Sequence, residues 1–91
     1  MPDNNPTHFP IDGTIDLHTF KPNEVKELIP DYIEACLEKN IYQIRIIHGK
    51  GTGKLRDVVR QTLSQHPHVK SFEGGKRGEG GEGVTVAKIR A

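Results

Sequence analysis

Apolar residues recur along most of this chain of 91 residues with the periods that are typical of strands and helices. Residues 14–18 alternate between apolar and polar side chains, which predicts a short strand with two different faces. Over residues 22–40 the apolar positions follow an i, i+3, i+4, i+7 rule, which predicts an amphipathic helix. Pro30 lies inside this segment, but the apolar stripe continues in phase across it, so we expect a kink and not a break.

The second half of the chain predicts three more strands and one more helix. Residues 42–48 are nearly continuous in apolar character, as in a strand covered on both faces. A second amphipathic pattern over residues 55–63 predicts a helix. Residues 69–73 and 84–89 are predicted to be strands. The glycine-rich segment 74–83 between them is charged and has no apolar anchor, so it should be mobile.

Together these elements predict the order β-α-β-α-β-β. The crossover between the first two strands is long enough to make them parallel, and such connections are almost always right-handed. We therefore expect an α/β (α+β) two-layer sandwich with a four-stranded mixed sheet and two helices on one face. The length allows one domain, which we place at residues 11–91. Residues 1–10 are polar and proline-bearing, and we expect a flexible tail there.

Charge is distributed unevenly along the chain, and this suggests a class of partner. Residues 1–40 hold three Lys or Arg against eight Asp or Glu, whereas residues 41–91 hold ten against four. A basic half on a nearly neutral protein is typical of nucleic-acid binders. On charge alone, a dipolar surface without a partner is an equally good interpretation.

Cysteine content and hydropathy exclude several classes of protein. The single cysteine, Cys36, excludes an internal disulfide framework and a thiolate metal cluster. No apolar run approaches the roughly 20 residues that cross a bilayer, and residues 1–10 lack the apolar core of a secretion signal. We therefore expect a cytoplasmic protein with no membrane segment.

Two histidines are predicted to meet at one edge of the sheet. His18 and His48 each end a predicted strand, and parallel strands end at the edge where open α/β sheets bind their ligands. Asp16 lies two residues before His18 on the same strand face, where its carboxylate could orient the imidazole or stabilise its protonated form. One such histidine is as often structural as functional, but a pair at matching strand ends favours function.

Residues 49–53 have the composition of a phosphate-binding loop. Their three glycines allow a sharp turn and a close approach to a bound group. Thr52 is the expected N-cap of the second helix, whose free N–H groups favour an anion. Lys50, Lys54 and Arg56 add positive charge. The spacing fits neither a Walker A loop nor the dinucleotide fingerprint, and a glycine-rich turn without a ligand stays open as the alternative.

Three motifs occur in order along the chain: Ile15-Asp16-Leu17-His18, then Ile47-His48-Gly49-Lys50-Gly51 with Gly53, Leu55 and Arg56, then Gly80-Gly81 followed by Gly83-Val84-Thr85-Val86. Together they resemble the small MutS-related (Smr) domain, over roughly residues 12–90. The resemblance implies a two-layer fold similar to the C-terminal domain of bacterial translation initiation factor three. It also implies nucleic-acid binding and, as in several family members, DNA-nicking or RNA-cutting endonuclease activity.

Residue chemistry and the resemblance together predict the site. The predicted catalytic residues are Asp16, His18 and His48. The residues predicted to bind nucleic-acid phosphates are Gly49, Lys50, Gly51, Thr52, Gly53, Lys54, Arg56, Lys76, Arg77, Gly80, Gly81 and Gly83. The resemblance implies that the glycine turn before the last strand faces this same site.

One position departs from the family pattern. Thr19 replaces the glycine that usually follows the Asp-Leu-His motif. If the turn requires a positive φ angle, a β-branched residue is strained there. Such strain would affect catalytic competence more than the fold.

Three functions are compatible with these residues. The leading hypothesis is an endonuclease that cleaves phosphodiester bonds of DNA or RNA. The alternative is a non-catalytic module that recognises a phosphate backbone or a branched structure. A third hypothesis, an enzyme for small phosphorylated molecules, needs a deep pocket that this sequence has little bulk to build. Phe20 and Phe72 are the aromatic residues least certain to be in the core, so base stacking is weakly supported.

The sequence leaves the cofactor and the oligomeric state open. A Mg or Mn ion could bind through Asp16 and a histidine, although Mg prefers a set richer in oxygen ligands. Chemistry without a metal is at least as well supported, because two histidines could serve as base and acid on an RNA 2′-hydroxyl. We expect a monomer or a weak homodimer.

Overall fold

The computed structural model describes residues 10–75 and 81–91. The predicted order of elements is confirmed, with bounds as follows: β1 (Thr14–Asp16), α1 (Pro22–Glu38), β2 (Gln43–Ile47), α2 (Lys54–Gln65), β3 (Val69–Gly74), a short 3₁₀ helix η2 (Gly81–Gly83) and β4 (Val84–Ile89). Within the described ranges, neither α-helix is long and apolar enough to cross a membrane. The predicted tail at residues 1–10 stays a prediction, since residues 1–9 lie outside the described part.

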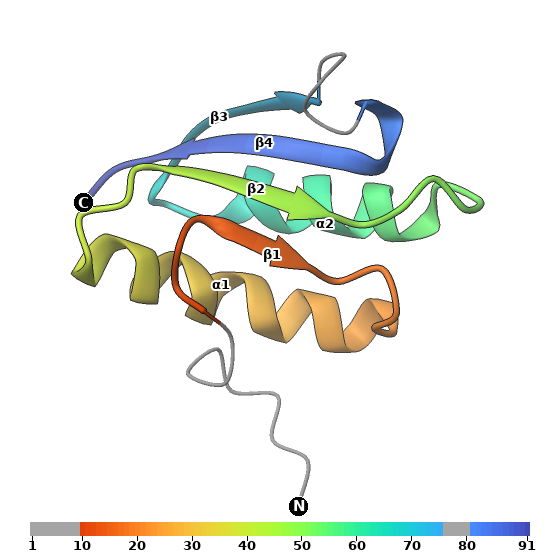
Figure 1. Ribbon diagram of the computed structural model, residues 1–91, viewed down its shortest axis with the longest axis horizontal. Coiled ribbons are helices and arrows are strands. Elements are labelled where there is room, and N and C mark those ends of the chain that lie inside the picture. Colours follow the sequence, from red (N-terminus) through yellow and green to blue (C-terminus); the bar gives the residue numbers. More distant parts are fainter. Residues whose placement is uncertain (1–9, 76–80) are drawn as a thin grey trace, which may run out of the picture.

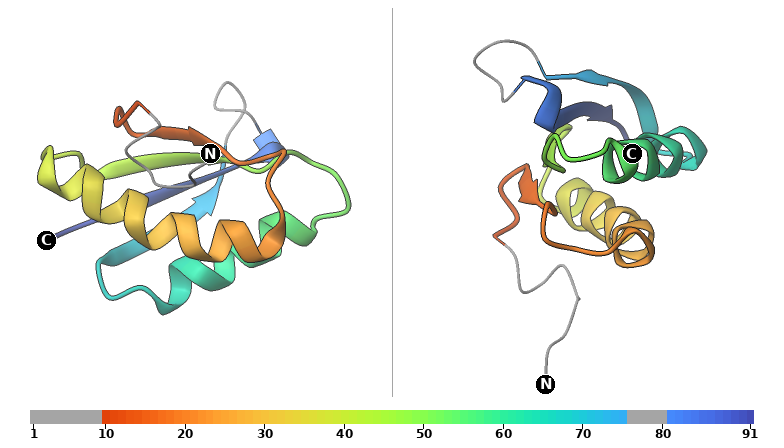
Figure 2. Two further views of the ribbon diagram at one scale, coloured as in Figure 1. Left: turned by 90° about the horizontal axis from the view of Figure 1, so that it is seen from below. Right: turned by 90° about the vertical axis from the view of Figure 1, so that its right-hand side faces the viewer.

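The four strands form one mixed sheet in the order β1-β2-β4-β3. β1 and β2 are parallel, and β4 is antiparallel to both β2 and β3. Both helices cover the same face, which confirms the predicted two-layer sandwich (Figures 1 and 2). As a result, the carboxyl ends of β1 and β2, the first turns of both helices and the start of β4 all gather at one edge of the sheet (Figure 1).

The helices and the inward face of the sheet enclose one core. α1 continues through Pro30 without a break, as the stripe predicted. In β2, Ile44 and Ile46 are fully buried, whereas Ile47 on the opposite face is only half-buried. The prediction that both faces of this strand are covered was therefore wrong, because both helices pack on the same face. Fully or nearly fully buried core residues from the other elements include Ile15, Leu17, Val25, Leu28, Ile29, Tyr32, Ile33, Cys36, Val59, Leu63, Ala87 and Ile89.

The remaining differences from the predicted elements are at their ends. The first helix stops at Glu38, two residues earlier than expected, and β3 continues to Gly74. The segment 74–83 was predicted to be a mobile loop. Residues 76–80 of it lie outside the described part of the chain, and residues 81–83 form the single turn of η2.

Tyr32 ties α1 to the beginning of β1. Its hydroxyl accepts a hydrogen bond from the backbone N–H of Gly13 at 3.1 Å and donates one to the carbonyl oxygen of Thr14 at 3.2 Å. Gly13 has φ +95°, and a Cβ atom there would lie 3.1 Å from the carbonyl oxygen of Gln43. The entry into β1 is therefore held by a buried phenol on one side and by β2 on the other.

This arrangement makes a prediction about stability. Tyr32→Phe removes the hydroxyl and both of its bonds to the backbone at the start of β1, so it should lower the free energy of unfolding by about 1–3 kcal/mol. Tyr42→Phe is the matched control, because its hydroxyl bonds to the Asn40 side chain on an exposed surface. It should cost less than about 0.5 kcal/mol. Urea unfolding of both variants measures the difference, and equal costs would show that the Tyr32 hydroxyl does not fasten β1.

Candidate nucleic-acid site

The carboxyl ends of β1 and β2 lie side by side, as their parallel pairing requires. β1 ends at Asp16 and β2 at Ile47, so His18 and His48 follow the strand ends, whereas the sequence predicted them as last strand residues. The pairing continues one residue further, because the N–H of Leu17 donates to the carbonyl oxygen of Ile47 at 2.7 Å. Both histidines are therefore still held at the same edge.

The backbone of Gly49 lies against His18. A Cβ atom added to Gly49 would be 3.4 Å from the Cβ atom of His18, and Gly49 has φ +78°. A side chain at this position would thus meet both a neighbour and an unfavourable backbone conformation. The structure brings the Asp-Leu-His motif and the glycine loop into direct contact.

His18 and Asp16 form a hydrogen-bonded pair on the exposed side of this edge. Asp16 Oδ1 accepts a bond from the backbone N–H of His18 at 3.0 Å and lies 2.5 Å from its ring Nδ1. Partial burial tends to raise the pKa of Asp16, but the hydrogen bonds from the His18 ring and backbone outweigh it and the pKa is lowered from 3.8. The carboxylate is therefore ionised near neutral pH, accepts the Nδ1 proton and orients the ring.

This pairing leaves one ring atom of His18 for chemistry. The side chain is 55% exposed. Its Nε2 atom has no hydrogen-bond partner among residues 10–75 and 81–91. It can therefore accept a proton from a bound molecule, or donate one to it, while Asp16 stabilises the charged ring.

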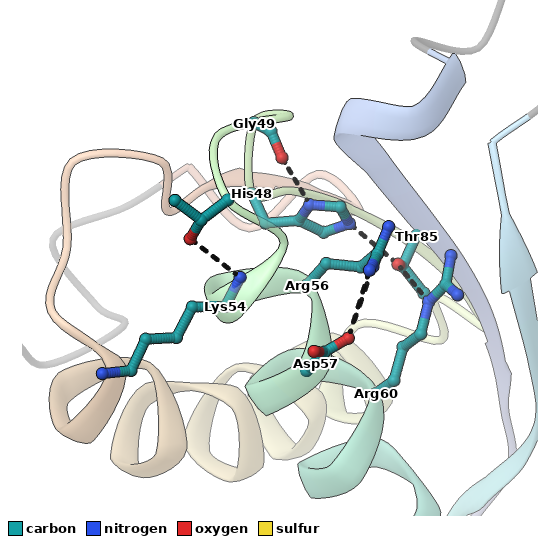
Figure 3. A network of polar contacts seen from close by, with 8 residues as sticks. His48, Gly49, Lys54, Arg56, Asp57, Arg60 and Thr85 are labelled. Atoms are coloured by element: carbon teal, nitrogen blue, oxygen red, sulfur yellow. Dashed lines mark hydrogen bonds and ion pairs between the residues drawn. The ribbon is translucent and has the colours of Figure 1, made fainter.

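His48 is in the opposite situation, because it is only 3% exposed and both of its ring nitrogens are engaged. Nδ1 lies 2.9 Å from the carbonyl oxygen of Gly49, and Nε2 lies 2.9 Å from Thr85 Oγ1 (Figure 3). Thr85 Oγ1 also accepts a long bond, 3.4 Å, from Nε of Arg60. Burial lowers the pKa of His48, and the positive charges of Arg60 and Arg56 add to this effect against the bond to Gly49. His48 is thus a buried, neutral imidazole.

The glycine turn before β4 is bonded to the same edge. The carbonyl oxygen of Gly83 accepts the backbone N–H groups of His48 at 2.9 Å and of Gly49 at 3.0 Å. A Cβ atom at Gly83 would lie 3.5 Å from the Gly49 backbone. Gly83 therefore holds the start of the glycine loop through its backbone, and it is not among the residues that line the cleft beside the loop.

A cleft of about 510 Å³ opens beside this pair of motifs. Residues of the Asp-Leu-His edge, the glycine loop and the first turns of both helices line it: His18, Pro22, His48, Gly49, Lys50, Gly51, Thr52, Gly53, Lys54, Leu55 and Arg56. Lys50 and Lys54 are exposed and form no ion pair within the described ranges. In the same part of the chain, the polar side-chain contacts of Arg56 are long ones, 3.4 Å, with the side chain of Asp57.

Backbone groups add to the positive character of this cleft. The N–H groups of Lys50, Gly51 and Thr52 have no acceptor in the described part of the chain. The first turn of α2 follows directly, and the first N–H groups of a helix also lack intrahelical partners. Successive free N–H groups beside a helix N-terminus are a favourable environment for a phosphate.

The helix cap differs from the prediction. Gly53, with φ +87°, is the N-cap of α2, and Thr52 lies one residue before it. The Thr52 hydroxyl accepts only a long bond, 3.4 Å, from the N–H of Lys54. A left-handed glycine at the cap lets the chain turn from the loop into the helix, and the threonine side chain is left at the cleft.

The predicted residues after β3 are partly beyond the described structure. Lys76, Arg77 and Gly80 lie outside the described ranges. Gly81 is half-exposed in η2, and it is not among the residues that line the cleft.

The donor atoms of this edge do not make a metal site by themselves. Among residues 10–75 and 81–91, no three His, Cys, Asp or Glu side chains are close enough together to hold a metal ion. Asp16 and His18 are the two side chains here that could contribute ligands, and one oxygen of Asp16 is already bonded to His18.

Thr19 is not strained. Asn40 is the one residue other than glycine with a positive φ angle in the described part of the chain. Thr19 instead lies exposed in a turn that the N–H of Phe20 closes onto the carbonyl oxygen of Leu17 at 3.0 Å. The replacement of the family glycine is therefore compatible with the local backbone.

Three residues of interest were not among the predicted site residues. Thr85 and Arg60 complete the contacts of His48, and Tyr42 is 50% exposed, the one large hydrophobic side chain so exposed in the described ranges. Phe20 and Phe72, considered for base stacking, pack partly buried against the core. The available signal for Thr85 was that it is the single polar residue in the otherwise apolar first four residues of β4, 84–87.

Comparisons with known proteins agree with this architecture. Residues 15–90 match the model of the Smr domain family. Endonuclease MutS2 of Caldicellulosiruptor bescii is 41% identical over 80 residues, which are 88% of this chain and 10% of that protein. Endonuclease MutS2 of Staphylococcus haemolyticus is 42% identical over 74 residues, 81% of this chain and again 10% of the relative. The chain thus spans about a tenth of the length of these relatives.

Two solved structures share the fold. The Smr domain of Thermus thermophilus MutS2 superimposes with a TM-score of 0.82 at 35% identity, covering 86% of this chain and 98% of the other. YdaL, a stand-alone small MutS-related protein from Escherichia coli, gives a TM-score of 0.81 at 22% identity, covering 90% and 67%. With a family match over nearly all of its folded length, this chain belongs to the Smr domain family.

Proposed function

We propose that this domain binds nucleic acid and cleaves its phosphodiester bonds as an endonuclease. One observation carries the proposal: the ionised Asp16 orients an exposed His18 at the rim of a cleft lined by cationic side chains and free N–H groups. The names of the MutS2 relatives, which are called endonucleases, support the same activity. The nucleophile would be water on DNA, and either water or the ribose 2′-hydroxyl on RNA.

The chemistry uses His18 as the proton-transfer group. Nε2 accepts the proton of the attacking hydroxyl or water, and Asp16 stabilises the imidazolium that forms. As the new bond to phosphorus forms, the P–O bond to the leaving oxygen breaks and that oxygen takes a proton from solvent. Lys50, Lys54 and the loop N–H groups stabilise the negative charge that develops on the phosphate. A Mg or Mn ion, if bound, would use Asp16 and would supply Lewis-acid activation of the phosphate.

His48 stays a predicted member of the catalytic set, but its surroundings favour a different role. To transfer a proton, the ring would have to give up the bond to Gly49 or the bond to Thr85. This leaves His18 as the one freely accessible imidazole of the predicted pair. The alternative function is a nucleic-acid-binding module without turnover. It is supported by the same finding, that only one of the two predicted catalytic imidazoles is free to transfer a proton.

The remaining parts of the proposal concern context. We propose that residues 11–91 form the functional unit, that it acts as a monomer or a weak homodimer, and that it works in the cytoplasm. These assignments are supported by the length, composition and hydropathy of the sequence.

The catalytic proposal makes a direct prediction. His18→Ala should lower cleavage of supercoiled plasmid or of RNA by at least about 100-fold, because it removes the proton-transfer group. Asp16→Asn should also lower it, since the ring loses its ionic partner. His68→Ala is the control, because His68 follows the far end of α2. Gel assays with Mg, Mn or chelator measure the rates and test the metal requirement.

The outcomes separate the two functions. Cleavage that survives His18→Ala would rule out the proposed role of this residue. No cleavage by the wild type, together with a retained gel shift on oligonucleotides, would support the binding module instead. Stronger binding of mononucleotides than of oligonucleotides would contradict both.

Phosphate binding in the cleft predicts a salt dependence. Each cation that contacts a phosphate should contribute about one unit to the slope of log K against log salt concentration. Lys50→Ala and Lys54→Ala should therefore each reduce the slope by about one. Lys39→Ala, at the opposite end of α1, should leave it unchanged. Fluorescence anisotropy of a labelled oligonucleotide over a salt series gives the slopes, and equal slopes for all three variants would place the nucleic acid elsewhere.

A further inference from the structure

A chain of polar contacts runs beneath the glycine loop, from the interior of the domain to the edge of the cleft. It begins at Arg60 on α2, passes through Thr85 on β4 and His48 after β2, and ends at the carbonyl oxygen of Gly49 (Figure 3). Neither Arg60 nor Thr85 lines the cleft. Thr85 is fully buried, so its contact with His48 is shielded from water, whereas the contacts at Arg60 and at Gly49 are partly buried.

The chemistry of the groups assigns a direction to every bond in this chain. A carbonyl oxygen only accepts, so the bond to Gly49 requires the proton of His48 on Nδ1. In a neutral ring Nε2 is then an acceptor, and the Thr85 hydroxyl must donate to it. The lone pairs of that hydroxyl are left to accept the Nε–H of Arg60. The arrangement therefore selects a single tautomer of His48.

Arg60 also lies close to β3. A Cβ atom added to Gly74 would lie 3.1 Å from Nη2 of Arg60, so the guanidinium is next to the end of β3 as well as bonded to β4. The positive charge close to His48 also opposes protonation of that ring, and Arg56 acts in the same direction.

The end of this chain of contacts is at the phosphate-binding loop. A carbonyl oxygen directed into an anion site would repel a phosphate, whereas the Gly49 oxygen is occupied by the His48 Nδ1–H. The next three N–H groups of the loop, at residues 50–52, have no acceptor in the described part of the chain. Fixing one carbonyl beneath the loop therefore leaves the donors of the following residues for a ligand.

We propose that Thr85 and Arg60 are positioning residues, which hold His48 in its Nδ1–H tautomer. This tautomer fixes the Gly49 carbonyl, and the loop N–H groups of residues 50–52 are then free to bind a phosphate. The identity of the ligand rests on the proposed function. The tautomer and the loop geometry do not depend on turnover.

The first test is spectroscopic and uses the full chain. Nitrogen-15 NMR of the protein labelled at its histidine rings should show His48 protonated at Nδ1 and unprotonated at Nε2 at neutral pH. Arg60→Met removes the nearby charge and should raise the pKa of His48, whereas Arg60→Lys keeps a positive charge and should leave this pKa closer to that of the wild type. An Nε2–H tautomer in the wild type would overturn the proposal.

The second test measures phosphate binding to the loop. Inorganic phosphate is titrated while the backbone amide signals of Lys50, Gly51 and Thr52 are followed. Thr85→Val should weaken binding about tenfold or more, because the buried Nε2 loses its donor. Thr85→Ser keeps the hydroxyl and should stay within about twofold of the wild type.

Controls keep the result interpretable. Thr62→Val removes a hydroxyl that bonds to the Val58 carbonyl at 2.7 Å and should change neither reading. If Thr85→Val does not fold, Arg60→Met with Thr85→Ser provides the comparison. Unchanged loop signals and affinity in Thr85→Val or Arg60→Met would overturn the proposal. If the tautomer and the phosphate affinities are as expected but the protein cuts no substrate, the role of Thr85 and Arg60 is supported and only the proposed endonuclease activity is contradicted.

Discussion

The parallel pairing of β1 with β2 is the constraint on which the rest of the molecule depends. Parallel neighbours need a long crossover, and α1 supplies it by packing its apolar stripe on one face of the sheet. Tyr32 fastens the start of β1, and the bond from Leu17 to Ile47 extends the pairing past its end. Two strand ends, two helix beginnings and the start of β4 therefore lie at one edge. This pairing brings together the groups that follow β1 and β2, and the antiparallel pairing of β4 with β2 adds Gly83 and Thr85.

Strand alternation then gives the two histidines different surroundings. His18 follows the outward-facing Asp16 and stays half-exposed, whereas His48 follows the inward-facing Ile46 by two residues and is buried. The two histidines lie at the same edge of the sheet, but His18 is on its exposed face and His48 is on the face that packs against the helices. One is left free to exchange a proton, and the other has both nitrogens bonded inside the protein. Nearness along an edge therefore does not imply a shared chemical role.

Local periodicity was sufficient to predict the elements, their order and the Asp16–His18 pair, because each depends on residues close together in sequence. The contacts of His48 could not be predicted in this way. They depend on the antiparallel register of β4 with β2, which places Thr85 opposite Ile46 although 37 residues separate it from His48. The cap of α2 was missed for a related reason. The side-chain preference for threonine gave way to the backbone freedom of Gly53, which the turn into the helix requires.

The turn between β3 and β4 is anchored at both of its ends. The N–H of Gly75 donates to the carbonyl oxygen of Val84 at 2.8 Å, and the carbonyl oxygen of Gly83 is held by the N–H groups of His48 and Gly49. The cost of closing a loop rises only slowly with its length when the ends are fixed. Insertions at residues 76–80 should therefore be tolerated, while the bonds between Gly83 and the start of the glycine loop are retained. The described residues on either side of the connection, Gly75 and Gly83, would keep their bonds to β4 and to the glycine loop.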